Sequence, residues 1–124
     1  KQVRLDLVPV HALWEVGRLY GIGAAKYAEN NWRQGYEWSK SYAALQRHAN
    51  LFWNGESIDA DGFHHLAAVI FHAMALMTFE REHPELDDRW VDPLKVFVGY
   101  EAPVAATVVF TPPSTNPSKE NPSA

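Results

Sequence analysis

Residues 66–77 read LAAVIFHAMALM, an apolar run of twelve residues that contains a single histidine, His72. The run is well short of the about 20 residues that cross a bilayer, so we expect a buried helix and no membrane partner. A helix that is apolar on nearly every side must be covered on every side. This requirement constrains the rest of the fold.

The chain around this run is small. It has 124 residues, of which 47% are hydrophobic and 21% are charged, as is typical of one globular domain. We expect the apolar helix to begin at Gly62 or Phe63 and to end near His83, because Pro84 prevents continuation. A body of about 100 residues has few elements that can cover such a helix. We therefore predict a homo-oligomer, either a dimer or a tetramer.

A first helix is predicted after Pro9, which suits a first helical turn. Apolar residues at three- and four-residue spacing predict its buried face, formed by Val10, Leu13, Trp14, Gly17 and Tyr20. Gly21 and Gly23 predict an interruption, after which residues 24–27 form a short second helical piece.

A stronger helix is predicted between Ser39 or Ser41, as the N-cap, and the stop signal Asn54-Gly55. Its predicted buried stripe consists of Ser41, Ala44, Leu45, His48, Leu51 and Phe52. Together these segments predict an all-α fold, a small bundle of three to four main helices that oligomerisation completes.

The end of the chain differs in composition. Five of the eight prolines follow Ala102, and the residues from about Thr111 onward are rich in Pro, Ser, Thr and Asn. We therefore predict a helical domain over residues 1–101 and a largely disordered tail over residues 102–124. The β-prone segment 104–110 either adds to a partner or lies on the body.

The composition excludes several classes of function. The chain has no cysteine, which excludes disulfide scaffolds, Cys-ligated metals and thiol nucleophiles. A formal net charge of −4 argues against direct DNA binding. Residues 1–50 hold seven basic and four acidic groups, and the remainder holds four basic and eleven acidic groups. The fold could therefore place an anion-binding surface beside a cation-binding one, although solvated faces explain the same asymmetry.

Histidines and acids in the second half of the chain are the candidates for a metal site. The histidines are His48, His64, His65 and His72, and the acids of the intervening loop are Glu56, Asp59 and Asp61. His65 and His72 are predicted to lie on one helical face. Neutral imidazole and carboxylate groups are common metal ligands. The alternative is that each histidine is a hydrogen-bonded core residue and that Asp59 or Asp61 only caps the last helix.

The basic half of the chain combines cationic and aromatic residues. The cations are Lys26, Arg33, Lys40 and Arg47, and the aromatic residues between and beside them are Tyr27, Trp32, Tyr36, Trp38 and Tyr42. Cations bind phosphates and aromatic rings stack on a base, which are the two requirements of a nucleotide pocket. Alternatively, the aromatic residues anchor an irregular loop on the helices.

Familiar nucleotide and hydrolase motifs are absent from the sequence. Gly21-x-Gly23 lacks the third glycine of a dinucleotide fingerprint, and no P-loop pattern occurs. No G-x-S-x-G elbow occurs either, so covalent hydrolase chemistry has little support.

Several blocks in a fixed order resemble a known family. They are residues 5–9 (LDLVP), 23–27 (GAAKY), Asn31-Trp32, 41–48 (SYAALQRH), Gly55-Glu56, His65-Leu66 and His72. This pattern, from Leu5 to Arg89, resembles the phage family of dATP/dGTP diphosphohydrolase N-terminal domains. That family is similar to the MazG-like all-α nucleotide pyrophosphohydrolases. The resemblance implies a helical oligomer that uses Mg²⁺ or Mn²⁺ to release pyrophosphate from a purine deoxynucleoside triphosphate.

The chain departs from the MazG-like metal pattern, which has Glu-x-x-Glu on one helix and Glu-x-x-Asp on the next. The corresponding stretches here are residues 46–49 (QRHA) and 65–68 (HLAA). We therefore predict a different set of metal ligands, His48, Asp61, His65 and His72. Glu56 and His65 are the predicted catalytic residues. The predicted substrate-binding residues are Lys26 and Arg47 for the phosphates, and Asn31 and Trp32 for the base or sugar.

Two other functions stay open from the sequence. The missing carboxylates also fit a nucleotide-binding module without catalysis, or a helical interaction domain that recruits a partner through its Pro-rich tail. No signal peptide is visible, so we expect a cytoplasmic protein, in the host cell if a phage encodes it.

Overall fold

The computed structural model describes residues 2–94, which contain three α-helices, three short 3-10 helices and no strand beyond one isolated bridge. The helices are α1 (Val10–Lys26), α2 (Trp38–Trp53) and α3 (His65–Glu82), with η1 (Leu5–Leu7), η2 (Asn31–Gln34) and η3 (Pro84–Leu86). The predicted all-α bundle is confirmed. None of these helices has the length and apolar character that a bilayer span requires. The boundary at residue 101, the tail over 102–124 and the segment 104–110 lie outside the described residues.

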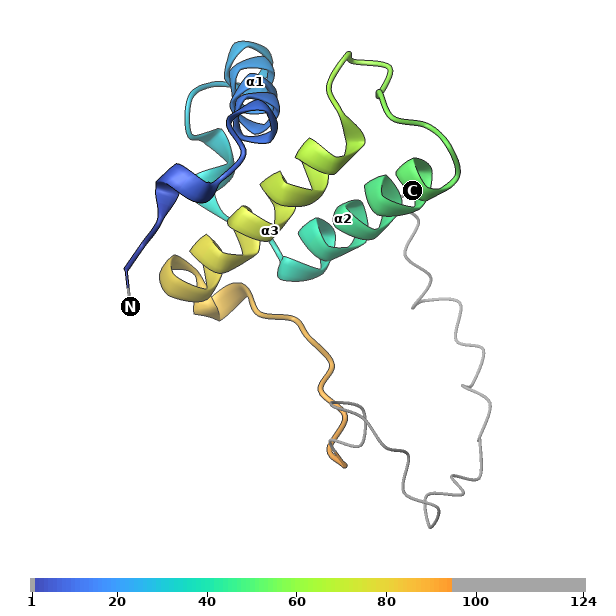
Figure 1. Cartoon of the computed structure of the whole chain (residues 1–124). Helices are drawn as coiled ribbons and strands as arrows, with labels where there is room; N and C mark the ends of the chain where they lie inside the picture. The colour runs from blue at the N-terminus through green and yellow to red at the C-terminus, as the bar shows by residue number, and fades with distance from the viewer. Residues whose placement is uncertain (1, 95–124) are drawn as a thin grey trace. The chain divides into compact units, whose positions relative to one another are not determined.

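Residues up to Arg89 form one compact unit, to which the following description applies. Figure 1 shows α2 and α3 side by side, joined by the loop over residues 54–64, with α1 on the side of α3 that faces away from α2. Tyr20 joins α1 to the middle of α3, because its ring lies 5.0 Å from the Phe71 ring and its hydroxyl donates to Met74 Sδ at 3.6 Å.

The core lies between α3 and the start of α2. Trp38, Ala75 and Phe79 are buried together. Trp32 and Tyr36, from the connection between α1 and α2, pack on Phe79 with ring centroids 6.0 and 5.0 Å away. Aromatic pairs at such separations contribute about 0.5–1.5 kcal/mol each beyond their buried area. The interpretation that these aromatic residues anchor an irregular connection is therefore supported.

The prediction for the first helix is wrong in two respects. α1 is continuous through Gly21 and Gly23. A glycine costs a helix only about 1 kcal/mol, which does not end a helix of this length. The predicted buried face is also turned away from the core: Val10, Leu13 and Trp14 are 66%, 49% and 76% exposed.

The inward face of α1 is rotated from the predicted one. Val16 is buried, and Tyr20 is the member of the predicted face that packs inside. The apolar spacing identified a real stripe on α1, but that stripe lies on the outer surface of this single chain.

The prediction of Ser39 or Ser41 as the N-cap of α2 is wrong. α2 begins at Trp38, and no side chain from Glu37 caps it. Asp88 caps it from far along the chain, accepting from Ser39 N at 2.9 Å and from Ser39 Oγ at 2.5 Å. The stop at Asn54-Gly55 is confirmed, with Gly55 at φ +100°.

The start of α3 also differs from the prediction. The helix begins at His65 instead of residue 62 or 63, and neither Asp59 nor Asp61 caps it. His64 is the cap, since its Nδ1 accepts from Leu66 N at 3.0 Å. The expected end is confirmed, because α3 stops at Glu82 before Pro84.

Gly35 fits closely against the end of α3. Its φ of +91° and ψ of 154° lie in a region that essentially only glycine adopts. A Cβ there would lie 2.8 Å from Leu86 Cδ1 and 3.0 Å from the His83 ring. His83 holds the same connection through Nε2, which lies 2.7 Å from the Arg33 carbonyl oxygen.

We predict that Gly35→Ala lowers the free energy of unfolding by about 1–3 kcal/mol, which is the usual cost of placing a residue with a Cβ in such a backbone conformation. Gly21→Ala is the matched control, because Gly21 is helical with open space around it, and we expect it to stabilise by about 0.5–1 kcal/mol. Urea unfolding followed by circular dichroism measures both. Equal stability of the two variants would contradict the tight contact at Gly35.

Candidate functional site

A cavity of about 720 Å³ opens beside α1 and α3. The end of α1, the connection to α2 and the middle of α3 line it, together with His48 from α2 and two residues of the loop before α3, Asp61 and Phe63. Its size lies within the range of about 300–1,000 Å³ that is usual for small-molecule sites.

Aromatic rings form the walls of this cavity. Phe71 packs against Tyr20 and Trp32, with ring centroids 5.0 and 5.9 Å away, and the Tyr20 and Trp32 rings are also in contact at 6.3 Å. The amides of Asn31 and Gln34 lie at the same cavity and are joined by a hydrogen bond of 3.3 Å. Flat apolar walls with amide groups beside them suit a planar heterocyclic ring that carries hydrogen-bonding edges.

Three of the four predicted substrate-binding residues, Lys26, Asn31 and Trp32, line this cavity. Lys26 Nζ lies 3.8 Å from Asp61 Oδ2, and both side chains are exposed. Arg47 does not line it and instead borders a separate, shallow hollow along α2.

The other two cations of the basic half also lie apart from the cavity. Arg33 stacks on the Trp32 ring, with its guanidinium carbon 5.3 Å from the ring centroid. Lys40 pairs with Glu37 at 3.1 Å. Among the residues that the structure describes, Lys26 is therefore the one lysine or arginine that lines the cavity.

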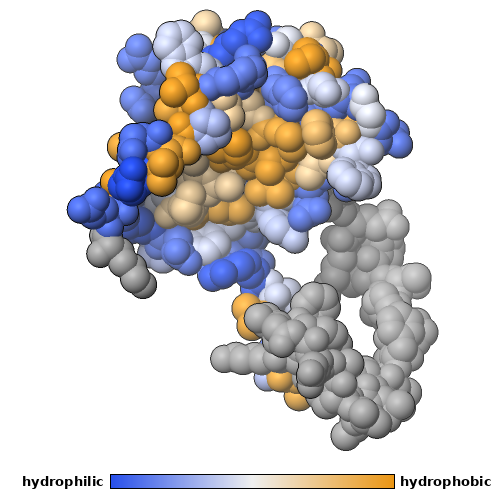
Figure 2. All heavy atoms as spheres, viewed as in Figure 1, coloured by the Kyte–Doolittle hydropathy of each residue, from blue (hydrophilic) through white to orange (hydrophobic). Residues whose placement is uncertain are grey.

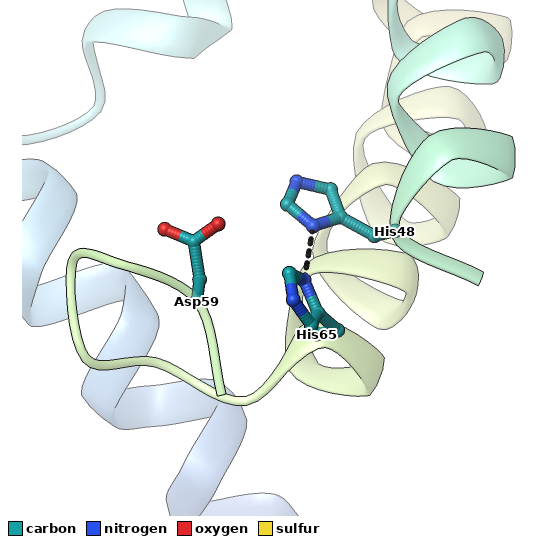
Figure 3. Close-up of side chains that lie close together, drawn as sticks. All are labelled: His48, Asp59 and His65. Atoms are coloured by element: carbon teal, nitrogen blue, oxygen red, sulfur yellow. Dashed lines mark hydrogen bonds between the residues drawn. The ribbon is translucent and has the colours of Figure 1, made fainter. Parts of the chain in front are cut away.

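Two predicted metal ligands meet beside this cavity. His48 from α2 and His65 at the start of α3 lie with Asp59 from the intervening loop, and one possible ligand atom from each lies within 4.8 Å of the others (Figure 3). His48 is 7% exposed and His65 is fully buried. The loop acid that lies beside the two histidines is Asp59, whereas the predicted ligand Asp61 lies beside Lys26.

Hydrogen bonds fix both nitrogens of the His65 ring. Its Nδ1 lies 2.8 Å from His48 Nδ1, and its Nε2 lies 2.9 Å from Glu56 Oε2. An ionised carboxylate only accepts, so the Nε2 of His65 donates to Glu56 and the proton between the two rings belongs to His48 when both are neutral. Burial and the charge of Arg47 lower the pKa of His48, which favours the neutral imidazole that binds metals.

His72 lies next to this pair but has different partners. Its ring stacks on the His48 ring with centroids 6.3 Å apart, and its Nδ1 lies 3.0 Å from Ser41 Oγ. Ser41 is fully buried and also bonds the Tyr36 hydroxyl at 2.5 Å. Burial lowers the pKa of His72 to about 4, so the ring is neutral at pH 7.

The sequence analysis missed Ser41 as the partner of His72, and Tyr36 as the partner of Ser41. A signal was present, because Ser41 and His48 are seven residues apart on the predicted buried stripe of α2. A serine on such a stripe needs a buried hydrogen-bond partner, and His72 is seven residues beyond His65.

A sequence model of the family described as dATP/dGTP diphosphohydrolase, N-terminal, matches residues 1–89. The chain belongs to this family. No curated protein and no solved structure shows significant similarity to it.

The two stretches that depart from the MazG-like pattern both contribute a residue to the candidate site. In the two stretches where that pattern has carboxylates, residues 46–49 and 65–68, the residues at the candidate site are His48 and His65. His65 occupies the first glutamate position of the second stretch, whereas His48 lies beside the glutamate positions of the first stretch, residues 46 and 49, and not at either of them.

We predict that the free energy of unfolding falls as the pH is lowered from 6.5 toward 4. The pKa of His72 is about 4 in the folded chain and near 6.5 when unfolded, so protons bind the unfolded state preferentially over this range. The lowered pKa of His48 acts in the same direction. Urea unfolding at pH 7 and pH 5, for the parent and for His72→Gln, measures the contribution of this ring as the difference. A His72 ring that titrates near pH 6.5 by NMR would contradict the assignment.

Proposed function

We propose that this chain hydrolyses purine deoxynucleoside triphosphates, dATP or dGTP, to the monophosphate and pyrophosphate with the help of a divalent cation. The observation that carries the proposal is that one cavity, in a chain of this family, joins an aromatic wall to a buried histidine cluster through His48. We place this activity in the cytoplasm, where such triphosphates are found.

The aromatic part of the cavity is the proposed site of the base. Trp32 offers a ring face, and its position is fixed by Phe71 and Phe79. Stacking on such a ring contributes about 1–3 kcal/mol per base. The Asn31 amide can donate to and accept from a base edge or the sugar.

The phosphates are proposed to extend toward Lys26 and the histidine cluster. Lys26 Nζ lies 3.8 Å from Asp61 Oδ2 and 5.4 Å from the Tyr27 ring centroid, and both of these are surface contacts, so its ammonium can turn to a phosphate at little cost. Arg47 lies outside the cavity, and its positive charge helps to lower the pKa of His48 and of His72.

The family resemblance implies a divalent cation, Mg²⁺ or Mn²⁺, and the nitrogen and oxygen atoms of His48, His65 and Asp59 are the donors that the chain offers to such a cation at one point. We propose these residues as ligands, with Asp61 and His72 next to them at the cavity. A bound cation would neutralise phosphate charge and activate water.

The side chains of this protein supply the remaining chemistry, which is the removal of a proton from the attacking water. Water attacks the α-phosphorus, a new P–O bond forms, and the bond to the bridging oxygen breaks so that pyrophosphate leaves. The Glu56 carboxylate is the proposed acceptor of the water proton, because it is exposed and is held by the Nε2 of the buried His65, which donates to it at 2.9 Å.

We also propose that copies of the chain associate through an exposed apolar face. Figure 2 shows a broad apolar area where α3 faces the viewer. Exposed or half-exposed apolar residues on η1, α1 and α3 are Leu5, Leu7, Val10, Leu13, Trp14, Leu66, Ile70 and Met77. Contiguous apolar surface of this kind marks an interaction site in soluble proteins.

The activity is tested by incubating the pure chain with each deoxynucleoside triphosphate and Mg²⁺ or Mn²⁺ and measuring pyrophosphate. We expect release from dATP or dGTP, and at least a hundredfold loss in His65→Gln and His48→Gln with unchanged helical circular dichroism. Nucleotide binding without turnover under either metal would contradict the proposal and support a binding module.

The phosphate contact is tested by Lys26→Met, with Lys40→Met as the matched control outside the cavity. Loss of a charged hydrogen bond costs about 1.5–3 kcal/mol, so KM should rise about 10- to 100-fold for Lys26→Met and stay unchanged for Lys40→Met. Equal effects of the two variants would remove Lys26 from the proposed site.

The association is tested by light scattering over a range of concentrations. We expect a dimer or tetramer, and a weakening of at least about tenfold in Trp14→Glu and Met77→Glu, because exposed Trp and Met residues of an interface core lose their burial. Tyr42→Glu changes an exposed aromatic residue of α2 outside this face and should leave the mass unchanged. A parent chain that stays monomeric at micromolar concentration would contradict the proposal.

A further inference from the structure

We infer that the cluster of His48, Asp59 and His65 selects a first-row transition-metal ion, with Mn²⁺ as its simplest representative, over Mg²⁺. The inference rests on the proposed function because it concerns the cation of the same site. It goes further by naming the class of ion from the ligands that this chain supplies.

The donor atoms are the first argument. Two imidazole nitrogens and one carboxylate oxygen can approach one point, since one atom of each residue lies within 4.8 Å of the others. Mg²⁺ takes oxygen ligands in a nearly octahedral arrangement and keeps several of its waters. Imidazole nitrogen is a better ligand for first-row transition-metal ions than for Mg²⁺, and a set of two histidines and one carboxylate is a recurrent site for Fe²⁺.

The hydrogen bonds of His65 are the second argument. Its Nε2 donates to Glu56 Oε2 at 2.9 Å, which leaves the lone pair of Nδ1 on the side of His48 and Asp59. A carboxylate behind a ligating histidine fixes the tautomer and the ring orientation in this way and raises its basicity. The proton that His48 shares with His65 can move to Nε2 of His48, which frees both Nδ1 atoms for a cation.

The third argument is that the loop carrying Asp59 is built to a fixed shape. The backbone of Asp59 is bonded to Phe63 O and to Gly62 N, both at 2.8 Å, and its Oδ2 accepts from Asp61 N at 3.0 Å. Arg18 of α1 holds Gly62 O at 2.9 Å. The carboxylate is therefore positioned before any ion arrives, which reduces the entropic cost of binding.

The preference is tested without nucleotide, by titrating the full chain with MnCl₂ and following the electron paramagnetic resonance signal of free Mn²⁺. We expect one Mn²⁺ per chain, and displacement by MgCl₂ only at concentrations at least about tenfold higher than those of Mn²⁺. Mn²⁺ that does not bind, or Mg²⁺ that displaces it at equal concentration, would overturn the inference.

Variants identify the ligands in the same titration. We expect Asp59→Asn and His65→Gln to weaken Mn²⁺ binding more than tenfold, and Glu56→Gln to weaken it about 10- to 100-fold, as is typical of a group behind a ligand. His11→Gln, on the outer side of α1, is the control for a histidine outside the cluster, and circular dichroism verifies folding. Weaker binding in Asp61→Asn but not in Asp59→Asn would overturn the ligand assignment.

The two proposals fail in different ways. Pyrophosphate release that Mg²⁺ supports while Mn²⁺ does not bind the free chain would reject the inference and keep the proposed function. Tight Mn²⁺ binding through Asp59 and His65, with no pyrophosphate released, would do the reverse.

Discussion

The packing of α2 against α3 is the constraint on which the candidate site depends. His48 and Ser41 are seven residues apart on α2, and His65 and His72 are seven residues apart on α3. Seven residues are two helical turns, so each pair lies on one face. Because α2 and α3 are joined by a loop and their residue numbers run in opposite directions along the contact, His48 meets His65 and Ser41 meets His72. One register therefore places both polar contacts.

These polar contacts also explain how a small core tolerates buried imidazoles. Burying a polar group without a partner costs roughly 1–3 kcal/mol in proteins. In the described part of the chain no buried side-chain nitrogen or oxygen lacks a hydrogen-bond partner. The aromatic residues have two roles as well, since Trp32 and Tyr36 pack on Phe79 and also line the cavity. The two interpretations of these residues, loop anchors or ligand walls, are compatible.

Features that depend on local spacing could be predicted from the sequence, and features that depend on distant partners could not. The seven-residue spacing of the histidines and the stop signals at Gly55 and Pro84 are local, and the helices follow them. Asp88 caps α2 from 49 residues away, which no pattern around Ser39 reveals. Asp59 and Asp61 lie in one turn, which Gly62 N closes by donating to Asp59 O, and the sequence does not reveal that Asp59 lies beside the histidines and Asp61 beside Lys26.

The segment after α3 determines how far this domain can be shortened. Its backbone accepts a hydrogen bond from the Trp38 indole at His83, its Asp88 caps α2, and the Arg89 guanidinium lies 4.8 Å from the Trp38 ring centroid. A fragment designed for crystallisation or NMR that stopped at the end of α3 would expose Trp38 and leave the first turn of α2 without its acceptor. The smallest fragment that keeps these contacts extends through Arg89, the residue at which the family match also ends.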